Sequence, residues 1–380
     1  MGFHPLSKLM IVPIMRSRPG IPIILGAFCV TEDNIGTGPK IWGFPNYEMN
    51  SLRASDFQSE TSDKDKQQSD MKRIISVYEI TVDEKCNRAF FMDSGMLQYH
   101  ENETYFIERP ALWVIDLPSN GCESREFSII RRTELPEDIV AKHSVRANGF
   151  LYLSLDYQSE NACDDLFLYV ANAFHNFLVV YDYRNDEFWS FTHETFLPDV
   201  SASNMVYDEH FQYEMVVGIN SIALGFPDEN RDRIAFYTPL CGYNQYSVST
   251  KVLKDKSKSP NHLSPEDITF VGHRGKNRQS SKIIMNYTYG VMFYSEVQSN
   301  QLRCWNIKKP LTSENMGVVF DSDTFVFSGQ MFIDSEGFLW FQSTAIPIIF
   351  GSDQPLDLSK VNNRFFRIKV SEAIRGTICE

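Results

Sequence analysis

Short runs of alternating hydrophobic and polar residues recur along this chain. Each run leads through a polar turn into a second run that is rich in aromatic and aliphatic residues. The clearest copy is ITVDEKCNRAFFMDSG, and similar stretches follow it, so that the copies cover residues 80–95, 153–173, 222–239, 282–296 and 331–345. Residues 7–15 look like a sixth copy that has lost its first strand. Alternation with a period of two predicts β-strands, and long helical periodicity is absent almost everywhere.

The spacing of these copies predicts how the strands are grouped. Each copy has one central residue in its second run, and these six residues can be used to measure the spacing: Met10, Phe91, Tyr169, Tyr237, Tyr294 and Phe341. Successive residues of this set are 81, 78, 68, 57 and 47 positions apart. A repeat of roughly 40–50 residues with several strands is typical of a propeller blade. The wider spacings contain polar inserts at residues 51–70 and 254–267, which we expect to be flexible loops.

Because one blade cannot bury both of its faces, neighbouring blades must stack around an axis. We therefore predict an all-β chain with one six-bladed β-propeller domain over residues 1–380. Its first blade would be truncated at the N-terminus, and a disulfide near the C-terminus would close it. Two unrelated β domains are the alternative.

The cysteines suggest how such a ring is fastened. A Cys304–Cys379 disulfide would tie the last blade to its neighbour. Cys86 and Cys163 both follow polar turns that lead into the second runs of successive copies, so they form the second predicted pair. The alternative is that all seven thiols are reduced. Three cysteines have no assigned partner: Cys29, Cys122 and Cys241.

Composition and charge narrow the classes of partner. The chain has 36 basic and 49 acidic side chains and a formal net charge of −13, which argues against binding a nucleic-acid backbone. No apolar stretch is long enough for a transmembrane helix. No CxxC pair, metal cluster, nucleophile elbow or phosphate-binding loop is visible. We expect no metal, no cofactor and no membrane span, and the oligomeric state is left open.

Several motifs, taken in order, resemble the yellow / major royal jelly protein family of insects. They lie at residues 18–22, 86–95, 109–117, 165–193, 272–276, 304–306, 328–343 and 364–379. The resemblance implies a six-bladed propeller, secretion, and disulfides at the positions of Cys86 with Cys163 and of Cys304 with Cys379. The N-terminal residues make a poor signal peptide, so the extracellular expectation rests on the resemblance. Two sequons, at Asn102 and Asn286, are candidate glycosylation sites.

Propellers place ligand sites at the mouth of a central channel, where the innermost strands end. The candidates follow the aromatic runs: Asp93, Asn172, Thr238, Glu296 and Thr344. The candidate walls of the pocket are Phe91, Tyr169, Phe236, Tyr294 and Ile346. Aromatic walls with a few carboxylates suit an aromatic amine, because the rings stack and a carboxylate pairs with the ammonium group. The alternative is that these residues fill the axis and cap strand ends.

The resemblance also suggests two activities. Some family members from blood-feeding insects bind biogenic amines, and their polar contacts align with Gly329, Thr344 and Ile346 here. Gly329 lacks the hydroxyl group of the threonine found in those members, and Ile346 lacks the stacking ring of their phenylalanine. The resemblance therefore does not imply conventional amine binding by this chain.

Other members resemble an enzyme that isomerises dopachrome, which needs a base and an acid. Four residues could serve on type alone, and no spacing singles any out, so catalytic residues stay unassigned: Asp93, His175, His273 and Glu296.

The leading hypothesis is a secreted protein that binds a small aromatic or catechol-type molecule and acts in cuticle pigmentation or melanin physiology. A dopachrome-converting enzyme is the first alternative, and a non-catalytic structural or nutritive protein is the second. In residues 272–276, GHRGK, we interpret Arg274 as a structural donor to backbone carbonyls.

Overall fold

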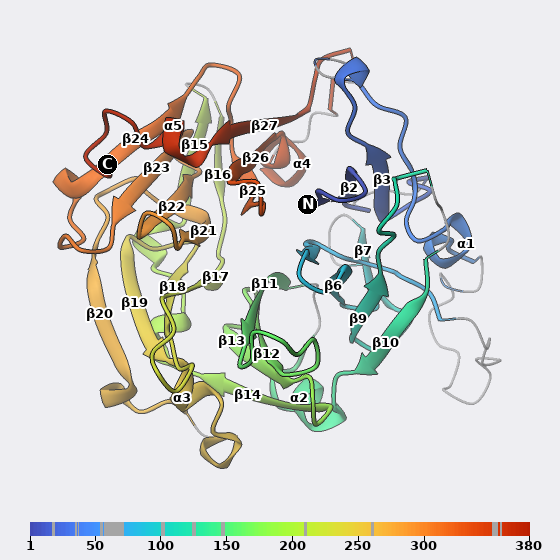
Figure 1. Ribbon diagram of the computed structural model, residues 1–380, viewed down its shortest axis with the longest axis horizontal. Coiled ribbons are helices and arrows are strands. Elements are labelled where there is room, and N and C mark those ends of the chain that lie inside the picture. The colour runs from blue at the N-terminus through green and yellow to red at the C-terminus, as the bar shows by residue number, and fades with distance from the viewer. Residues whose placement is uncertain are drawn as a thin grey trace. The chain divides into compact units, whose positions relative to one another are not determined.

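A computed structural model describes most of the chain as two compact units, Met1–Phe150 and Leu151–Glu380. The described residues are 1–16, 20–34, 36, 38–53, 56, 72–99, 103–123, 127–145, 149–208, 211–259, 262–351, 356–357 and 359–380. Both units consist mainly of antiparallel sheets (Figure 1). The expectation of one domain over the whole chain stays a prediction.

The first unit contains two four-stranded sheets and one hairpin. The first sheet has the order β1 (Gly2–His4), β2 (Leu9–Pro13), β3 (Leu25–Cys29) and β4 (Trp42–Gly43). The second has the order β5 (Thr81–Asp83), β6 (Arg88–Asp93), β9 (Ala111–Asp116) and β10 (Ile129–Glu134), and the hairpin consists of β7 (Met96–Tyr99) and β8 (Glu103–Phe106). The helices are short: η1 (Glu32–Asn34), α1 (Tyr47–Asn50) and α2 (Glu137–Lys142).

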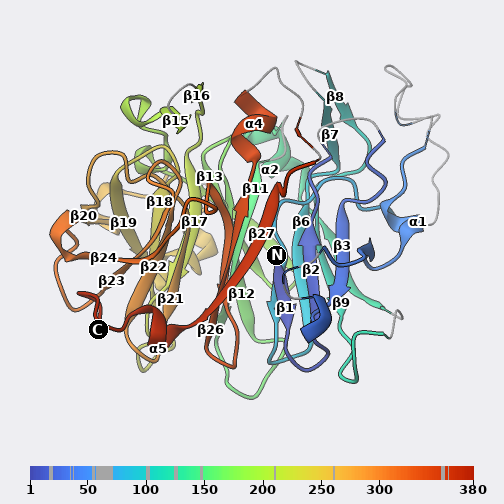
Figure 2. The same cartoon turned by 90° about the horizontal axis from the view of Figure 1, so that it is seen from above.

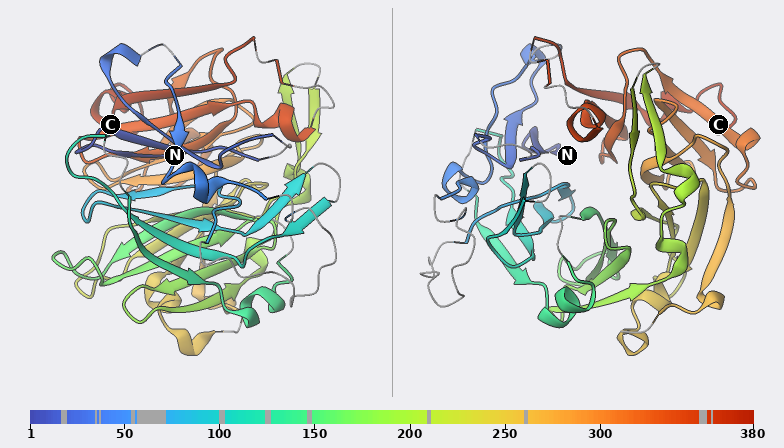
Figure 3. Two further views of the ribbon diagram at one scale, coloured as in Figure 1. Left: turned by 90° about the vertical axis from the view of Figure 1, so that its right-hand side faces the viewer. Right: turned by 180° about the vertical axis from the view of Figure 1, so that it is seen from behind.

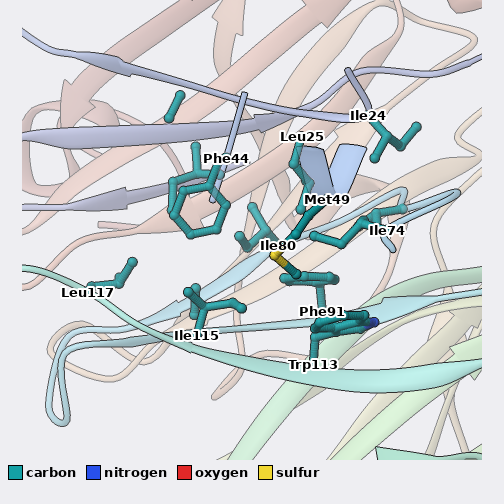
Figure 4. Packing of buried hydrophobic residues seen from close by; sticks show 14 of the residues in the cluster. Ile24, Leu25, Phe44, Met49, Ile74, Ile80, Phe91, Trp113, Ile115 and Leu117 are labelled. Atoms are coloured by element: carbon teal, nitrogen blue, oxygen red, sulfur yellow. The ribbon is translucent and has the colours of Figure 1, made fainter. Parts of the chain in front are cut away.

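The two sheets of the first unit bury a common apolar core. Phe91 of β6 and Trp113 of β9 are fully buried, and their rings stack with centroids 6.1 Å apart (Figure 4). Leu25 of β3 and Phe44 belong to the same cluster of buried side chains. Successive side chains of a strand point to opposite faces, so every second apolar residue of β6 and β9 belongs to this cluster.

The second unit contains four successive sheets. The first has the order β11 (Phe150–Tyr157), β12 (Leu166–Asn172), β13 (Phe177–Asp182) and β14 (Glu187–Thr192). The second has the order β17 (Ile219–Leu224), β18 (Ile234–Pro239), β19 (Asn244–Ser249) and β20 (Ile268–His273). The third has the order β21 (Ser280–Asn286), β22 (Val291–Glu296), β23 (Gln301–Asn306) and β24 (Met316–Asp321). The fourth has the order β25 (Ser328–Ile333), β26 (Phe338–Thr344) and β27 (Asn363–Lys369).

Helices and one hairpin connect these sheets. The hairpin, β15 (Asn204–Asp208) with β16 (Phe211–Glu214), and helix α4 (Ile346–Gly351) lie at one end of the sheets, and α5 (Val370–Ala373) lies at the other (Figure 2). The remaining helices are α3 (Thr250–Leu253), η3 (Glu194–Phe196), η4 (Val200–Ala202), η5 (Lys256–Lys258), η6 (Pro265–Asp267) and η7 (Ser313–Asn315).

Neighbouring sheets of the second unit meet along their first strands. Strand β17 contacts β21, and β21 contacts β25. Figure 3 shows the same succession of sheets from behind. Side chains join the strands as well: the Ser221 hydroxyl of β17 accepts a hydrogen bond from the Ile283 N–H of β21, 3.0 Å away. With two sheets in the first unit and four in the second, the fold class is a six-bladed β-propeller, as the sequence predicted.

The residues that mark the repeat all lie in the second strand of a sheet. They occupy β2, β6, β12, β18, β22 and β26, one in each of the six sheets. The sequence interpretation took these runs to end at the innermost strand of each sheet, and that placement stays a prediction. Each aromatic run is flanked by strands on both sides, and that position explains its strong apolar character.

The prediction that the first sheet has lost its first strand at the N-terminus is wrong. Gly2–His4 forms β1, which pairs antiparallel with β2 from Gly2 opposite Ile11 to His4 opposite Leu9. Three residues are too few to show alternation in the sequence. The sheet with three strands is instead the last one, β25–β27.

Turns between paired strands use residues that tolerate a left-handed backbone. Such residues connect β5 to β6, β12 to β13, β13 to β14, β22 to β23 and β21 to β22, and all have a positive φ: Asn87, Asn176, Asp186, Asn300 and Gly290. Asn, Asp and Gly are the residue types that adopt this conformation most readily. These turns fix the registers of the hairpins.

The disulfides hold segments that are distant in the sequence. Cys304 of β23 is bonded to Cys379, which confirms the predicted C-terminal disulfide. Cys29 is bonded to Cys122, a pair that the sequence analysis left unassigned. Cys86 and Cys163 each take part in a disulfide, and their mutual pairing stays a prediction. The one cysteine without a disulfide is Cys241.

The two polar inserts differ in how far they are described. Most of residues 51–70 lie outside the described residues. In the other insert, the Ser259 hydroxyl donates a hydrogen bond to the Ser190 carbonyl of β14 (3.0 Å), and His262 bridges to Thr192. Described residues of this insert thus contact the preceding sheet, and the flexibility of the insert stays a prediction.

Candidate functional site

A pocket of about 220 Å³ lies between the segment that follows β14 and the turn that joins β18 to β19. The lining residues include two tyrosines, two carboxylates and no basic side chain: Glu194, Thr195, Leu197, Pro198, Asp199, Pro239, Cys241, Gly242, Tyr243, Asn244 and Tyr246. All of them belong to the second unit. This composition attracts cations and planar rings more than anions.

The tyrosine rings of the pocket are held in place by other rings. Tyr246 is stacked on Tyr237, with ring centroids 5.8 Å apart, and its edge meets Phe270. The Tyr246 hydroxyl accepts a hydrogen bond from Asn244 Nδ2 at 3.1 Å. Tyr243 lies against His273, with centroids 5.9 Å apart. The aromatic wall is therefore formed before any ligand arrives.

The two carboxylates lie on the opposite side of the pocket from the turn. Asp199 precedes η4, and its Oδ1 accepts hydrogen bonds from the Ser201 N–H (2.9 Å) and hydroxyl (2.7 Å). Glu194 begins η3, and its side chain is exposed. Helix capping thus fixes Asp199, whereas Glu194 has room to adjust.

A buried guanidinium group shapes the turn that forms the other wall. Arg274 is fully buried and donates hydrogen bonds to the Gly242 carbonyl (2.7 Å), the Asn244 carbonyl (3.0 Å) and Thr238 Oγ1 (2.8 Å). The interpretation of Arg274 as a structural donor to backbone carbonyls is confirmed. Thr238, a predicted ligand residue, also donates to the Asn244 carbonyl and supports the turn from behind.

The free thiol in the pocket wall is unreactive in its present surroundings. Cys241 is buried, donates to the Met215 carbonyl at 2.7 Å and accepts from the Val217 N–H. Burial raises the pKa of the Cys241 thiol to about 11. Because the thiolate is the nucleophile, Cys241 contributes shape to the pocket and no covalent chemistry at neutral pH.

Asp93, at the end of β6, lies in the first unit, and its carboxylate binds backbone N–H groups. Its carboxylate accepts hydrogen bonds from the N–H groups of Ile75 (2.9 Å), Ser76 (2.8 Å) and Gly95 (2.9 Å). Burial nevertheless raises the pKa of Asp93 to about 6. The carboxylate is held inside the protein and fixes residues 75–76 against β6.

This raised pKa predicts a pH dependence of stability. The pKa of the unfolded chain is close to the ordinary value of 3.8, so the folded state binds the proton more tightly. The stabilising contribution of the Asp93 proton to the free energy of unfolding is therefore complete below pH about 4, and it is lost as the pH rises through about 6. Urea unfolding of the wild type and of Asp93→Asn should give free energies whose difference changes across this interval and is constant above it. Parallel curves from pH 4 to 7 would refute the assignment.

Two other predicted residues, Asn172 and Glu296, end strands of the second unit. Asn172 Oδ1 accepts from the His175 N–H at 3.1 Å and thereby caps a turn. Glu296 accepts from Arg303 Nε (3.0 Å) and from the Ser299 hydroxyl (2.6 Å), and burial raises its pKa. Both side chains are fully buried. They cap strand ends in the structure, and ligand binding by them stays a prediction.

The three positions aligned with amine contacts do lie together, Gly329 and Thr344 in the last sheet and Ile346 at the start of α4. A Cβ atom at Gly329 would lie 3.2 Å from Thr344 Cγ2 and 3.8 Å from Ile346 Cδ1. The Tyr152 hydroxyl of β11 donates a hydrogen bond to the Gly329 carbonyl. The Lys282 ammonium lies 4.0 Å from the centre of the Tyr152 ring. Protein side chains therefore occupy the space beside Gly329.

The predicted wall residues Phe91 and Tyr294 are core residues in the structure. Both are fully buried, Phe91 against Trp113 and Tyr294 with its hydroxyl donating to Gln245 Oε1 at 2.8 Å. Neither lines the pocket described above. The sequence analysis in turn missed four lining residues. Two follow β14, one follows β18 and one lies in β19: Glu194, Asp199, Tyr243 and Tyr246.

Two further findings concern ions and membranes. Within the described residues, no three His, Cys, Asp or Glu side chains are grouped as a metal site would require. No helix in that part of the chain is long and apolar enough to cross a membrane.

Comparisons with known proteins place the chain in a family. The family model described as "Major royal jelly protein" matches residues 75–379. L-dopachrome tautomerase yellow-f of Drosophila melanogaster is 31% identical over 373 residues, which are 97% of this chain and 79% of the relative. The yellow-related salivary protein ASP4 of Phlebotomus orientalis is 32% identical over 310 residues, which are 81% of this chain and 74% of the relative.

A solved structure shows a weaker likeness. The putative 6-phosphogluconolactonase from Bacteroides uniformis aligns with a TM-score of 0.48 at 8% identity, over 88% of this chain and 75% of that chain. A likeness at this level has no bearing on activity. The family match and the yellow-related relatives decide the assignment. The chain therefore belongs to the yellow / major royal jelly protein family.

Proposed function

We propose that this chain binds a small catechol-type aromatic amine in the pocket between η3–η4 and the β18–β19 turn. The observation that carries the proposal is that two tyrosines, two carboxylates and no basic side chain line this pocket. An ammonium group is attracted both to carboxylates and to the faces of aromatic rings. Asn244 and Thr195 add hydrogen-bonding groups suited to phenolic hydroxyls.

The size of the pocket limits the ligand. Sites for drug-sized molecules measure about 300–1,000 Å³, whereas this pocket measures about 220 Å³. A single ring with a short amine chain, such as dopamine, suits that volume. We further propose that the protein is extracellular and acts in cuticle or melanin physiology. Family membership supports this, and so do the disulfides, which form in oxidising compartments.

Calorimetric titration with dopamine tests the site through two matched variants. Asp199 and Asp255 cap 3-10 helices in the same way, each accepting from the N–H and hydroxyl of a serine two residues later. Only Asp199 lines the pocket. We expect Asp199→Asn to weaken dopamine binding about fivefold, as for one partly exposed ion pair, and Asp255→Asn to leave it unchanged. No heat with the wild type, or equal losses in both variants, would overturn the proposal.

Dopachrome tautomerisation is the second candidate, and the 31% identity to L-dopachrome tautomerase yellow-f favours it. The reaction needs a base that takes a proton from carbon and an acid that returns one to oxygen. Among the lining residues, the Glu194 carboxylate is the available base. Burial raises the pKa of Tyr243, so its hydroxyl stays protonated and can donate.

Dopachrome decay in the presence of the purified protein separates the two candidates. For the enzyme, we expect conversion faster than in buffer and a lower kcat in Tyr243→Phe, which keeps the ring and removes the proton. Conversion at the rate of buffer across pH 5–8 would exclude the enzyme. Such a result together with no dopamine binding would favour a structural or nutritive role.

A further inference from the structure

Three exposed aromatic side chains come from two segments of the second unit that contact each other. Phe226 follows β17, and Tyr287 and Tyr289 belong to the turn between β21 and β22. Their exposed fractions are 48%, 45% and 44%. Phe226 meets Tyr287 edge to face with centroids 5.7 Å apart, and a Cβ atom at Gly290 would lie 3.9 Å from the Phe226 ring. We call these three rings the Phe226 platform.

Contacts with neighbouring groups hold one ring of the Phe226 platform, Tyr287, in place. The Tyr287 hydroxyl donates to the Leu224 carbonyl at 3.0 Å, and the Arg233 guanidinium lies 5.5 Å from the centre of the Tyr287 ring. Arg233 is in turn paired with the buried Asp156, with Nε and Oδ1 2.9 Å apart. Exposed rings that are fixed in this way are suited to receive a flat apolar surface, and a cluster of them indicates an occupant.

A sequon lies in the same turn. Residues 286–288 read Asn-Tyr-Thr, and Thr288 is exposed. Asn286 Oδ1 accepts a hydrogen bond from the Tyr289 N–H at 3.0 Å, whereas Nδ2 has no hydrogen-bond partner in the described part of the chain. Nδ2 is the atom that carries an N-linked glycan. Asn286 is 7% exposed and directly precedes Tyr287, so a sugar on Nδ2 would begin next to the residue that carries this ring.

We propose that Asn286 carries an N-linked glycan whose first N-acetylglucosamine packs on the Phe226 platform. In the modification, Nδ2 loses a proton and forms a bond to the anomeric carbon of the sugar, and the diphosphate of a lipid-linked donor leaves. The faces of such sugars present C–H groups that pack well against aromatic rings. The glycan thus covers the apolar surface as an intramolecular ligand. The proposal requires passage through the secretory pathway, which the Cys304–Cys379 disulfide supports.

Glycopeptide mass spectrometry tests the modification on protein secreted from insect cells with a supplied signal peptide. The peptide that contains Asn286 should carry a glycan in the wild type and in Thr288→Ser, which keeps the sequon. The same peptide should be unmodified in Thr288→Val, which has the same shape and lacks the hydroxyl. An unmodified Asn286 in the secreted wild type would overturn the proposal.

Thermal unfolding tests the packing separately. In the wild-type background, Thr288→Val should lower Tm by about 2 °C, because the rings lose their cover. In a Phe226→Ser background, where the platform is incomplete, the same change should have no effect on Tm. Equal shifts in both backgrounds would show that the glycan does not use the rings.

Discussion

Replacing Cys379 by serine is expected to lower the free energy of unfolding by about 4 kcal/mol, because the disulfide closes a long loop. Cys304 and Cys379 are separated by 75 positions, and their Cα atoms are 6.2 Å apart, within the range of unstrained disulfides. The bond also holds the C-terminal segment in place. Val370 and Ile374 of this segment pack in the same buried cluster as Phe341.

Urea unfolding of three variants checks this expectation. Cys379→Ser and the double variant Cys304→Ser/Cys379→Ser should be destabilised to about the same extent, because either change breaks the same bond. Cys241→Ala, which removes a buried thiol without breaking a disulfide, should cost only about 1 kcal/mol. A Cys379→Ser variant as stable as Cys241→Ala would mean that the bond does not fasten the fold.

Replacing Arg274 by lysine is expected to lower the free energy of unfolding by about 3 kcal/mol and to abolish measurable dopamine binding. The guanidinium serves Thr238, Gly242 and Asn244 at once from a fully buried position. An ammonium group cannot reproduce that planar arrangement of donors, and each carbonyl left unsatisfied costs about 1–3 kcal/mol. The Pro239–Asn244 turn would then lose its shape, and with it one wall of the pocket.

The control for this variant is Arg375→Lys, since Arg375 is exposed. It should change neither the stability nor the affinity for dopamine by more than about 0.5 kcal/mol. If Arg274→Lys unfolds like the wild type, or binds dopamine with unchanged affinity, the role assigned to Arg274 is incorrect.

The features that the sequence predicted are those with a local signal. The six second strands are mainly apolar, so the residues from Met10 to Phe341 that mark them fall in one strand of each sheet. Arg274 was interpreted from its place in the family loop GHRGK, whereas the carbonyls of Gly242 and Asn244 that it serves lie 32 and 30 positions earlier. The family motifs added the Cys304–Cys379 pair, which lies in two of them.

The features that the sequence could not predict depend on how distant segments pack. Cys29 ends β3, and its partner Cys122 lies 93 positions later in a loop, so neither neighbourhood identifies the other. The pocket is formed in the same way. Its carboxylates follow β14 and its tyrosines flank the β18–β19 turn, and only the packing of two sheets brings them together. In contrast, the sequence placed Asp93 at the end of a strand, but it could not show that its carboxylate accepts hydrogen bonds from backbone N–H groups.

A crystal structure of the protein with saturating dopamine tests the account most directly. The account predicts electron density for the ligand in the pocket, with its ring against Tyr243 or Tyr246 and its ammonium group toward Asp199 or Glu194. Density beside Gly329 and Thr344 instead, or an empty pocket at a concentration that saturates the calorimetric signal, would contradict it.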